Sequence, residues 1–184
     1  MRSLELNGDN AADTTLQDSM YLDAVKAYGT TLSRLVRGYE RDASRQQDLM
    51  QDIHVALWKS LESFDGKCAL QTWVYRVAHN VAIRHMTNRK RIRLRELHTL
   101  EEMPEPAADH DADLQHTRRE SLRQLFELME KLKPLDRQVI LLYLEEQNAM
   151  TIADITGLSP ENVATKIHRI KQLLRAMFRE RGLL

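Results

Sequence analysis

Five polar residues share one face of an expected helix near the end of the chain. Over residues 160–177, Val163, Ile167, Ile170 and Leu174 recur at helical spacing and form an apolar side. At about 100° per residue, the opposite side presents carboxyl, hydroxyl, imidazole, guanidinium and amide groups, which can all hydrogen-bond to base edges. These residues are Glu161, Thr165, His168, Arg169 and Gln172. The spacing therefore predicts a helix face suited to reading DNA.

The residues just before this helix predict the turn that would present it. Gly157 follows a short apolar segment that contains Ala153, and glycine can leave a helix with positive φ at no steric cost. Ser159 is a good N-cap and Pro160 suits the first helical position. This pattern is typical of a helix-turn-helix, although an ordinary helical hairpin with a solvated outer face is the alternative. From residue 151 on, the chain holds six Lys or Arg and three acids. This excess of positive charge favours binding to the phosphates of DNA.

Composition favours helices and an intracellular protein. The chain has 184 residues, 42% of them hydrophobic, with only six glycines, four prolines and 5% aromatic residues, which predicts an all-α fold. The single cysteine, Cys68, cannot form an internal disulfide. No apolar run is long enough to span a membrane, and the N-terminus lacks the apolar core of a signal peptide. We therefore expect a cytoplasmic protein without membrane insertion.

Charge is segregated along the chain although 27 Lys and Arg balance 27 Asp and Glu. Residues 67–97 hold eight Lys or Arg and one Glu, whereas residues 98–117 hold six acids, two prolines and no Lys or Arg. The second segment has the composition of a flexible linker. We expect two small helical domains around it. The predicted parts are a disordered tail at 1–19, a first domain at 20–95, the acidic linker at 96–117 and a second domain at 118–184.

Hydrophobic spacing predicts the helices within each domain. The expected ranges are 20–38, 44–61 and 70–91 in the first domain, and 118–132 and 135–146 before the helix-turn-helix in the second. The inward side of the first helix should contain Leu22, Val25, Leu32, Leu35 and Val36. On the second, the apolar residues in helical register are Leu49, Ile53, Ala56, Leu57 and Leu61. Its polar side includes Asp48, Gln51 and Asp52, which form one compact patch at i, i+3 and i+4.

Four segments in this order resemble the extracytoplasmic-function (ECF) group of bacterial RNA polymerase sigma factors. They are DLMQDIHVALW (48–58), FDGKCALQTWVYRVAHNVAIRHM (64–86), LKPLDRQVILLYL (132–144) and IADITGLSPENVATKIHRIKQLLR (152–175). The resemblance assigns region 2 to about residues 20–91 and region 4 to about residues 120–179. It implies a sigma factor that binds core RNA polymerase through the clamp coiled coil and the flap, directs it to promoters and helps open the minus-10 region. An anti-sigma protein is a further expected partner.

The resemblance also implies roles for individual residues in region 2. Asp48, Gln51 and Asp52 would bind core polymerase, whereas the residues alone favour a solvated acidic face, which is what most charged patches on helices are. Asp65, Gly66, Lys67 and Asn80 would line a pocket for a flipped minus-10 base. Asn80 could instead hydrogen-bond only within its own domain, and Trp73 is expected in the core rather than as a stacking platform. Phosphates would be held by Arg76, Arg84, Arg89, Lys90 and Arg91.

In region 4, the resemblance places the minus-35 readers at Ala164, Thr165, His168 and Arg169. Ala164 stands where many members of the family carry a long side chain, so it can offer only an apolar contact, for example to a thymine methyl. The wider expected DNA-binding set adds Glu161, Asn162, Lys166 and Gln172.

Other classes of function fit the sequence less well. The chain contains no HExxH, GxSxG or glycine-rich phosphate loop, and its seven histidines lack metal-ligand spacing. We therefore expect no enzymatic activity, no catalytic residue, no metal and no cofactor. A stand-alone helix-turn-helix regulator would leave the segments at 48–52 and 64–72 unexplained. A sigma-like decoy that binds only an anti-sigma protein is disfavoured by the basic run at 84–95.

Overall fold

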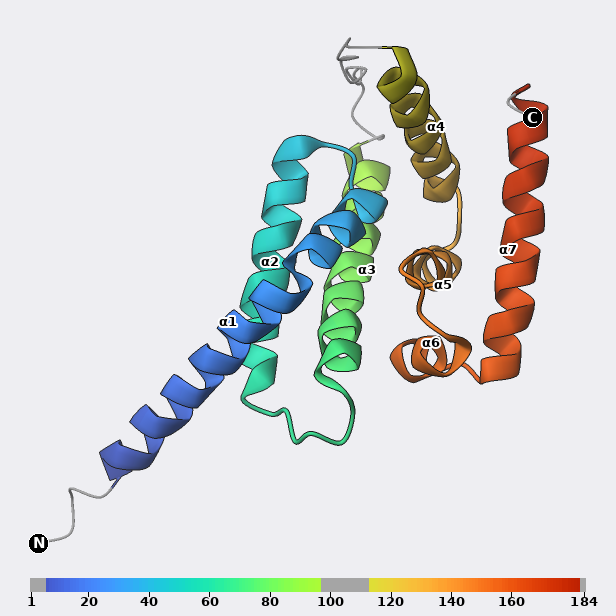
Figure 1. Cartoon of the computed structure of the whole chain (residues 1–184). Coiled ribbons are helices and arrows are strands. Elements are labelled where there is room, and N and C mark those ends of the chain that lie inside the picture. Colours follow the sequence, from blue (N-terminus) through green and yellow to red (C-terminus); the bar gives the residue numbers. More distant parts are fainter. Residues whose placement is uncertain (1–5, 97–112, 183–184) are drawn as a thin grey trace, which may run out of the picture.

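The computed structural model describes residues 6–96 and 113–182, with side chains placed for 16–92 and 122–182. Within these ranges the protein consists of helices joined by short turns, without a β-strand, so the all-α prediction is confirmed. Figure 1 shows the elements in chain order. They are α1 (Leu6–Tyr39), α2 (Ala43–Leu61), α3 (Leu70–Glu96), α4 (Asp113–Glu130), α5 (Pro134–Leu144), α6 (Ala149–Thr156) and α7 (Pro160–Glu180).

Helices α1, α2 and α3 pack together as the first domain. Leu32 of α1, Leu49, Ile53 and Leu57 of α2, and Val74 of α3 have no exposed surface. The three from α2 recur at i, i+4 and i+8 and form the apolar stripe that the sequence predicted. Asp42 caps α2, since its side chain accepts a hydrogen bond from the backbone N–H of Arg45 at 2.9 Å.

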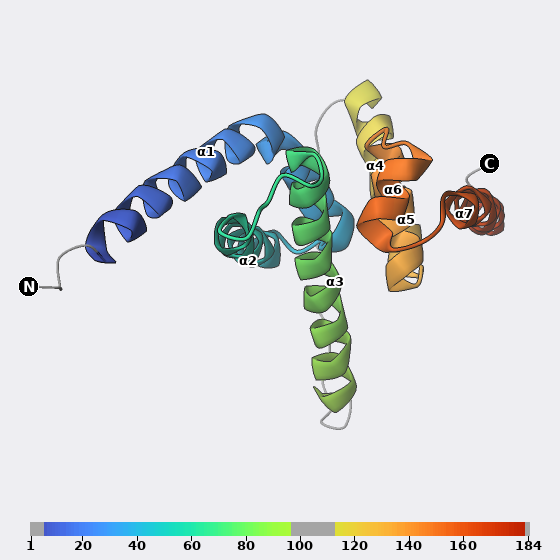
Figure 2. The same ribbon diagram turned by 90° about the horizontal axis from the view of Figure 1, so that it is seen from below.

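The second domain is built from α4, α5, α6 and α7. Its fully buried side chains include Met129 of α4, Leu142 of α5, Ile152 of α6 and Val163 of α7. Helix α7 lies against α5 and α6, and α4 also contacts α7. Figure 2, seen from below, shows α5 and α6 between α3 and α7. The two domains are therefore in direct contact through α3, α5 and α6.

The structure corrects three expectations, two about where helices begin and one about the burial of a side chain. Helix α1 begins at Leu6, so most of the predicted tail at 1–19 is helical. Near the end of this segment α1 contacts α2, because Gln17 donates to the carbonyl of Trp58 and the Trp58 indole donates to Asp18, both at 2.7 Å. Leu22, predicted to be buried, is 64% exposed. Helix α4 starts at Asp113, within the predicted linker, whose residues 97–112 lie outside the described part of the chain.

A buried pair of rings joins α1 to α3. The Tyr39 hydroxyl and the His79 Nδ1 atom are 2.9 Å apart, and His79 is 2% exposed. Burial lowers the pKa of His79 to about 3 and raises the pKa of Tyr39. Both groups are therefore neutral in the folded protein near neutral pH.

The buried histidine predicts an acid-sensitive first domain. Because the folded pKa lies below the unfolded value of about 6.5, the unfolded state binds an extra proton between the two values. The contribution of neutral His79 to the free energy of unfolding is fully present above pH 6.5. It falls by roughly 1.4 kcal/mol per pH unit as the pH drops below that value. Urea unfolding at pH 7 and pH 5 should show this loss. The His79→Gln variant should show a smaller loss, and an identical loss in both proteins would contradict the assignment.

Candidate nucleic-acid interface

The helix-turn-helix forms where the sequence predicted it, and its corner is fixed by backbone and capping contacts. Gly157 has a φ of 75° and donates its N–H to the carbonyl of Ala153 at 2.8 Å. Ser159 accepts a hydrogen bond from the N–H of Asn162 at 3.3 Å, and Pro160 occupies the first turn of α7. Asn148 caps α6 in the same way through the N–H of Thr151. These contacts set the angle at which α7 leaves α6.

Helix α7 turns its predicted apolar side inward and its polar side to solvent. Val163, Ile170 and Leu174 are buried and Ile167 is half-buried. Seven of the eight predicted minus-35 residues are exposed, namely Glu161, Asn162, Ala164, Thr165, His168, Arg169 and Gln172. His168 and Gln172 are paired, with their Nε2 atoms 2.9 Å apart. The outer face of α7 therefore offers adjacent donors and acceptors for base edges.

Glu161 carries negative charge at the N-terminus of α7. Its own backbone N–H and the Ser159 hydroxyl donate to the carboxylate and lower the pKa of Glu161. A carboxylate there can accept from the cytosine amino group but repels phosphate. It therefore favours a base contact over a backbone contact at this position.

Lys166 differs from the other predicted minus-35 residues. Its Nζ atom lies 2.5 Å from Asp136 Oδ1 of α5, and its side chain is 31% exposed. The physical reason is its register, since residue 166 is three after Val163 and four before Ile170 and so borders the apolar side. The same spacing in the sequence could have revealed this. Lys166 holds α7 against α5 instead of extending outward.

The loop between α2 and α3 is an ordered turn. Gly66 has a φ of 72°, and Asp65 accepts from the backbone N–H of Lys67 at 3.2 Å and from its ammonium at 2.5 Å. These bonds lower the pKa of Asp65. Asp65, Gly66 and Lys67 are all exposed. The turn thus holds a carboxylate and an ammonium side by side at the surface.

Asn80 is exposed on α3, and its side chain forms no hydrogen bond within the described residues. Its donor and acceptor are therefore free to meet a base edge. Trp73, in contrast, is half-buried and packs against residues at the end of α2 and the start of the loop. Its indole donates to the Ser60 hydroxyl at 3.0 Å, and its ring lies edge-on to Phe64 with centroids 5.4 Å apart. This agrees with the expectation that Trp73 belongs to the core.

The basic residues of α3 fall into two groups. Arg84, Lys90 and Arg91 are exposed, as a phosphate-binding role would require. Two others are engaged within the protein: Arg76 donates to the carbonyl of Asp154 in α6 at 3.0 Å, and Arg89 forms an ion pair with the buried Glu40. The sequence could not reveal these two contacts, because each joins residues far apart in the chain.

Asp48, Gln51 and Asp52 are exposed together on α2, as their spacing predicted. Beside them, a surface cleft of about 560 Å³ is lined by residues of α2 and α3. Its walls combine Gln51 and Asp52 with basic residues of α3, and its apolar surface includes Val55 and Ile92, which are 48% and 53% exposed. The sequence analysis missed both apolar residues. Val55 follows Asp52 by three positions, which places it on the same helix face.

Other kinds of site are not found in the described ranges. Over residues 6–96 and 113–182, no three His, Cys, Asp or Glu residues are grouped to hold a metal ion. Within the same ranges, none of the helices has the length and apolar character of a membrane span.

Family models and curated relatives agree with this arrangement. Residues 24–92 match Sigma-70 region 2, and residues 122–174 match Sigma-70 region 4. RNA polymerase sigma factor YlaC of Bacillus subtilis is 32% identical over 132 residues, which cover 70% of this chain and 75% of that protein. The chain thus contains the two helical regions of a Sigma-70 type factor. It belongs to the ECF RNA polymerase sigma factors.

Two further relatives show the range of lengths in this family. RNA polymerase sigma-H factor of Pseudomonas aeruginosa is 29% identical over 143 residues, covering 77% of this chain and 71% of that protein. ECF RNA polymerase sigma factor SigG of Mycobacterium tuberculosis is 28% identical over 152 residues, covering 71% of this chain. The chain spans only 41% of the length of SigG.

Solved structures share the fold. CnrH, in its complex with the cytosolic domain of CnrY, has a TM-score of 0.62 at 21% identity, covering 92% of this chain and 98% of that one. The sigma factor RpoE of Bartonella quintana, in complex with the anti-sigma factor NepR, has a TM-score of 0.64 at 18% identity, covering 86% and 96%.

The different surroundings of Lys166 and Arg169 predict different effects of the same substitution. Lys166→Gln should lower the free energy of unfolding by up to about 1 kcal/mol, since it removes a half-buried ion pair, and leave base preference unchanged. Arg169→Gln should leave stability unchanged and lose about 1–3 kcal/mol of discrimination among minus-35 sequences. Thermal unfolding and competition binding on variant promoters measure the two effects. The reverse pattern would contradict the proposed orientation of α7.

Proposed function

We propose that this chain is a promoter-specificity subunit that joins core RNA polymerase, reads two promoter elements and helps to open the DNA. The observation that carries the proposal is the presence of a region 2 and a region 4 in order in one chain, each with an exposed polar surface. A stand-alone regulator would need only the second. The chain contributes recognition and binding, and the polymerase performs the covalent chemistry.

Core polymerase is proposed to bind the surface of α2. Asp48, Gln51 and Asp52 supply exposed polar contacts, and Val55 adds an exposed apolar side chain next to them. An exposed apolar residue beside a polar patch is typical of a binding surface. Because the polymerase acts in the cytoplasm, the cytoplasm is also the proposed location of this chain.

The minus-10 element is proposed to bind the loop after α2 and the adjacent face of α3. Asp65 and Lys67 offer an exposed carboxylate and ammonium in the loop, and Asn80 offers an exposed amide on α3, which are the kinds of group that capture of an unpaired base requires. Arg84, Lys90 and Arg91 extend this surface with exposed positive charge for phosphates. Binding the unpaired base but not the duplex would favour the open complex.

The minus-35 element is proposed to bind the outer face of α7. Thr165, His168 and Arg169 are its central exposed groups, and Ala164 permits only an apolar contact. The helix-turn-helix corner presents this face to the major groove. An anti-sigma protein is a further proposed partner, supported by the fold shared with the partner-bound CnrH and RpoE.

Run-off transcription with purified core polymerase and genomic fragments of the source bacterium tests the function. The wild-type chain should direct transcripts from a limited set of fragments, and core alone should not. Asp48→Lys with Asp52→Lys should abolish both the transcripts and co-purification with core, because two exposed acids become cations without loss of buried contacts. Lys26→Glu, an exposed charge reversal on α1 outside the proposed docking surface, is the matched control. Full association of the double variant with core would refute the docking surface.

The role of Asn80 is tested by comparing duplex and pre-melted templates. Asn80→Ala should reduce permanganate-reactive thymines and run-off product on duplex promoters, because its side chain is exposed and free to bind a base. A template with a pre-melted bubble should recover much of the activity. Thermal stability should be unchanged. Equal failure on both templates would mean that Asn80 has no role in opening.

A further inference from the structure

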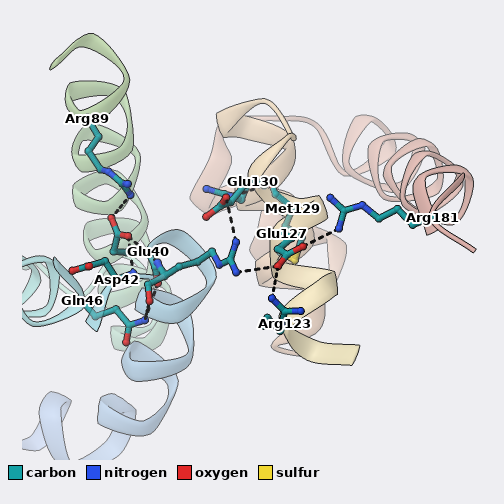
Figure 3. Close-up of polar contacts among 11 residues, drawn as sticks. Glu40, Asp42, Gln46, Arg89, Arg123, Glu127, Met129, Glu130 and Arg181 are labelled. Atoms are coloured by element: carbon teal, nitrogen blue, oxygen red, sulfur yellow. Dashed lines mark hydrogen bonds and ion pairs between the residues drawn. The ribbon is translucent and has the colours of Figure 1, made fainter. Parts of the chain in front are cut away.

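The cation that neutralises Glu40 belongs to the basic segment predicted to bind DNA. Glu40 of α1 is 1% exposed, and its two carboxylate oxygens have different partners. Oε1 accepts the backbone N–H groups of Arg41 and Asp42 at 2.8 and 3.0 Å, whereas Oε2 binds the guanidinium of Arg89 on α3 (Figure 3). The backbone therefore holds one oxygen, and Arg89 supplies the opposite charge at the other.

Arg89 also borders a second place where its charge can be used. Its side chain is 38% exposed and lines the cleft of about 560 Å³ formed by residues of α2 and α3. Lys59 and Arg84 line the same cleft, together with the acid Asp52. A phosphate group in the cleft would meet these cations, and a guanidinium binds phosphate through short, charge-assisted hydrogen bonds. Arg89 can therefore serve either of two anions, the buried carboxylate or a phosphate.

Movement of Arg89 to a phosphate would leave the carboxylate of Glu40 buried without its cation. Removal of one partner of a buried ion pair is strongly destabilising, because the remaining charge has lost its compensation and cannot reach water. The backbone donors at Oε1 do not replace a full positive charge. Use of Arg89 by DNA therefore requires another cation at Oε2.

His85 is placed to be that cation. It lies one turn before Arg89 on α3, and its Nε2 atom is 3.5 Å from the same Oε2 atom of Glu40 that Arg89 binds. This Nε2 atom is buried and makes no hydrogen bond within the described residues. Imidazole is the side chain that changes its charge most readily between about pH 5 and 8, and the protonated ring is a cationic donor. His85 can therefore take over Oε2 with little movement.

Charged groups from four helices act on this exchange. The groups around His85 are Glu40 of α1, Asp52 and Lys59 of α2, and Arg84 and Arg89 of α3 itself. From α5, Arg137 has its pKa lowered by burial, a shift that the charge of Glu40 opposes, but its guanidinium donates to the carbonyl of Met129. Departure of Arg89 removes a nearby positive charge and leaves Glu40 uncompensated. Both changes favour a protonated His85.

We infer that His85 is a positioning residue for phosphate binding, because it takes up a proton and replaces Arg89 at Glu40, which releases Arg89 to a phosphate in the cleft between α2 and α3. The proton comes from solvent and stays on the imidazole ring, while Arg89 remains charged throughout. The buried carboxylate thus has one cation before and after the exchange. The consequence for minus-10 DNA rests on the proposed function, whereas the exchange at Glu40 does not.

A proton taken up on binding makes the affinity for DNA depend on pH. The DNA-bound form then holds one more proton than the free form, so binding is favoured at low pH. The affinity falls as the pH rises, by up to about tenfold per pH unit. A structural role of His85 alone would produce no such dependence.

The exchange is tested first in the full chain without DNA, from the nitrogen-15 signals of the histidine rings at about pH 7. Arg89→Gln should move the signals of His85 to those of a doubly protonated ring, and adding Glu40→Gln should return them to the neutral position. Arg89→Lys keeps a cation at Glu40 and should leave the ring neutral. Arg37→Gln, which removes an exposed cation three residues before Glu40, is the matched control and should have no effect. A neutral His85 in a folded Arg89→Gln protein would overturn the exchange.

The same signals in the wild-type chain test the exchange with the buried ion pair intact. Saturation with a single-stranded thymidine oligonucleotide should convert the ring of His85 to the doubly protonated form, since phosphate draws Arg89 away from Glu40. The same oligonucleotide, labelled for fluorescence anisotropy, gives the affinity at about pH 6 and pH 8. The ratio of the two affinities should be about threefold or more larger in wild type and His54→Gln than in His85→Gln.

The outcomes separate this inference from the proposed function. A bound oligonucleotide that leaves His85 neutral would show that Arg89 stays with Glu40, and it would overturn the coupling to phosphate. A pH dependence that persists unchanged in His85→Gln would assign the proton to another group, with the same consequence. Absence of binding in every variant would instead count against the proposed minus-10 surface, while the comparison of Arg89→Gln with Arg89→Lys still decides the exchange.

Discussion

The arrangement of both regions depends on the contacts made by the buried carboxylate of Glu40. It is 1% exposed and accepts hydrogen bonds from the backbone N–H groups of Arg41 and Asp42 at 2.8 and 3.0 Å. It also binds Arg89 of α3 (Figure 3). His85, on the same helix, lies 3.5 Å from the carboxylate. A buried charge is tolerated only when it is paired and hydrogen-bonded in this way. One side chain thereby fixes the turn between α1 and α2 and attaches it to α3.

The geometry of that turn determines what region 4 can contact. Arg41 follows Glu40 directly and extends across to Glu127, which also binds Arg123 and Arg181 of region 4. These three cations, opposed by partial burial, lower the pKa of Glu127. Glu127 therefore remains ionised and joins the start of α2 to both ends of region 4. A local backbone turn thus positions an interdomain contact.

Much of the fold could be predicted from the sequence because its signals are local. The stripe Leu49, Ile53 and Leu57 and the corner at Gly157 depend on spacing and capping within a few residues, and both were predicted correctly. Leu22 was assigned wrongly, because its helical register fits a core but α1 is longer than expected and leaves it at the surface. Periodicity shows which residues share a face. It does not show where a packing partner ends.

The candidate sites could be predicted only where their polar side chains are exposed to solvent. The face around His168 and the patch around Asp48 need only helical spacing, and both sets are exposed as expected. Arg76, Arg89 and Lys166 were grouped with free cations, although each has an acceptor that lies at least 30 residues away in the chain. Such pairings depend on tertiary packing. A sequence rich in arginine therefore overstates the charge available for DNA.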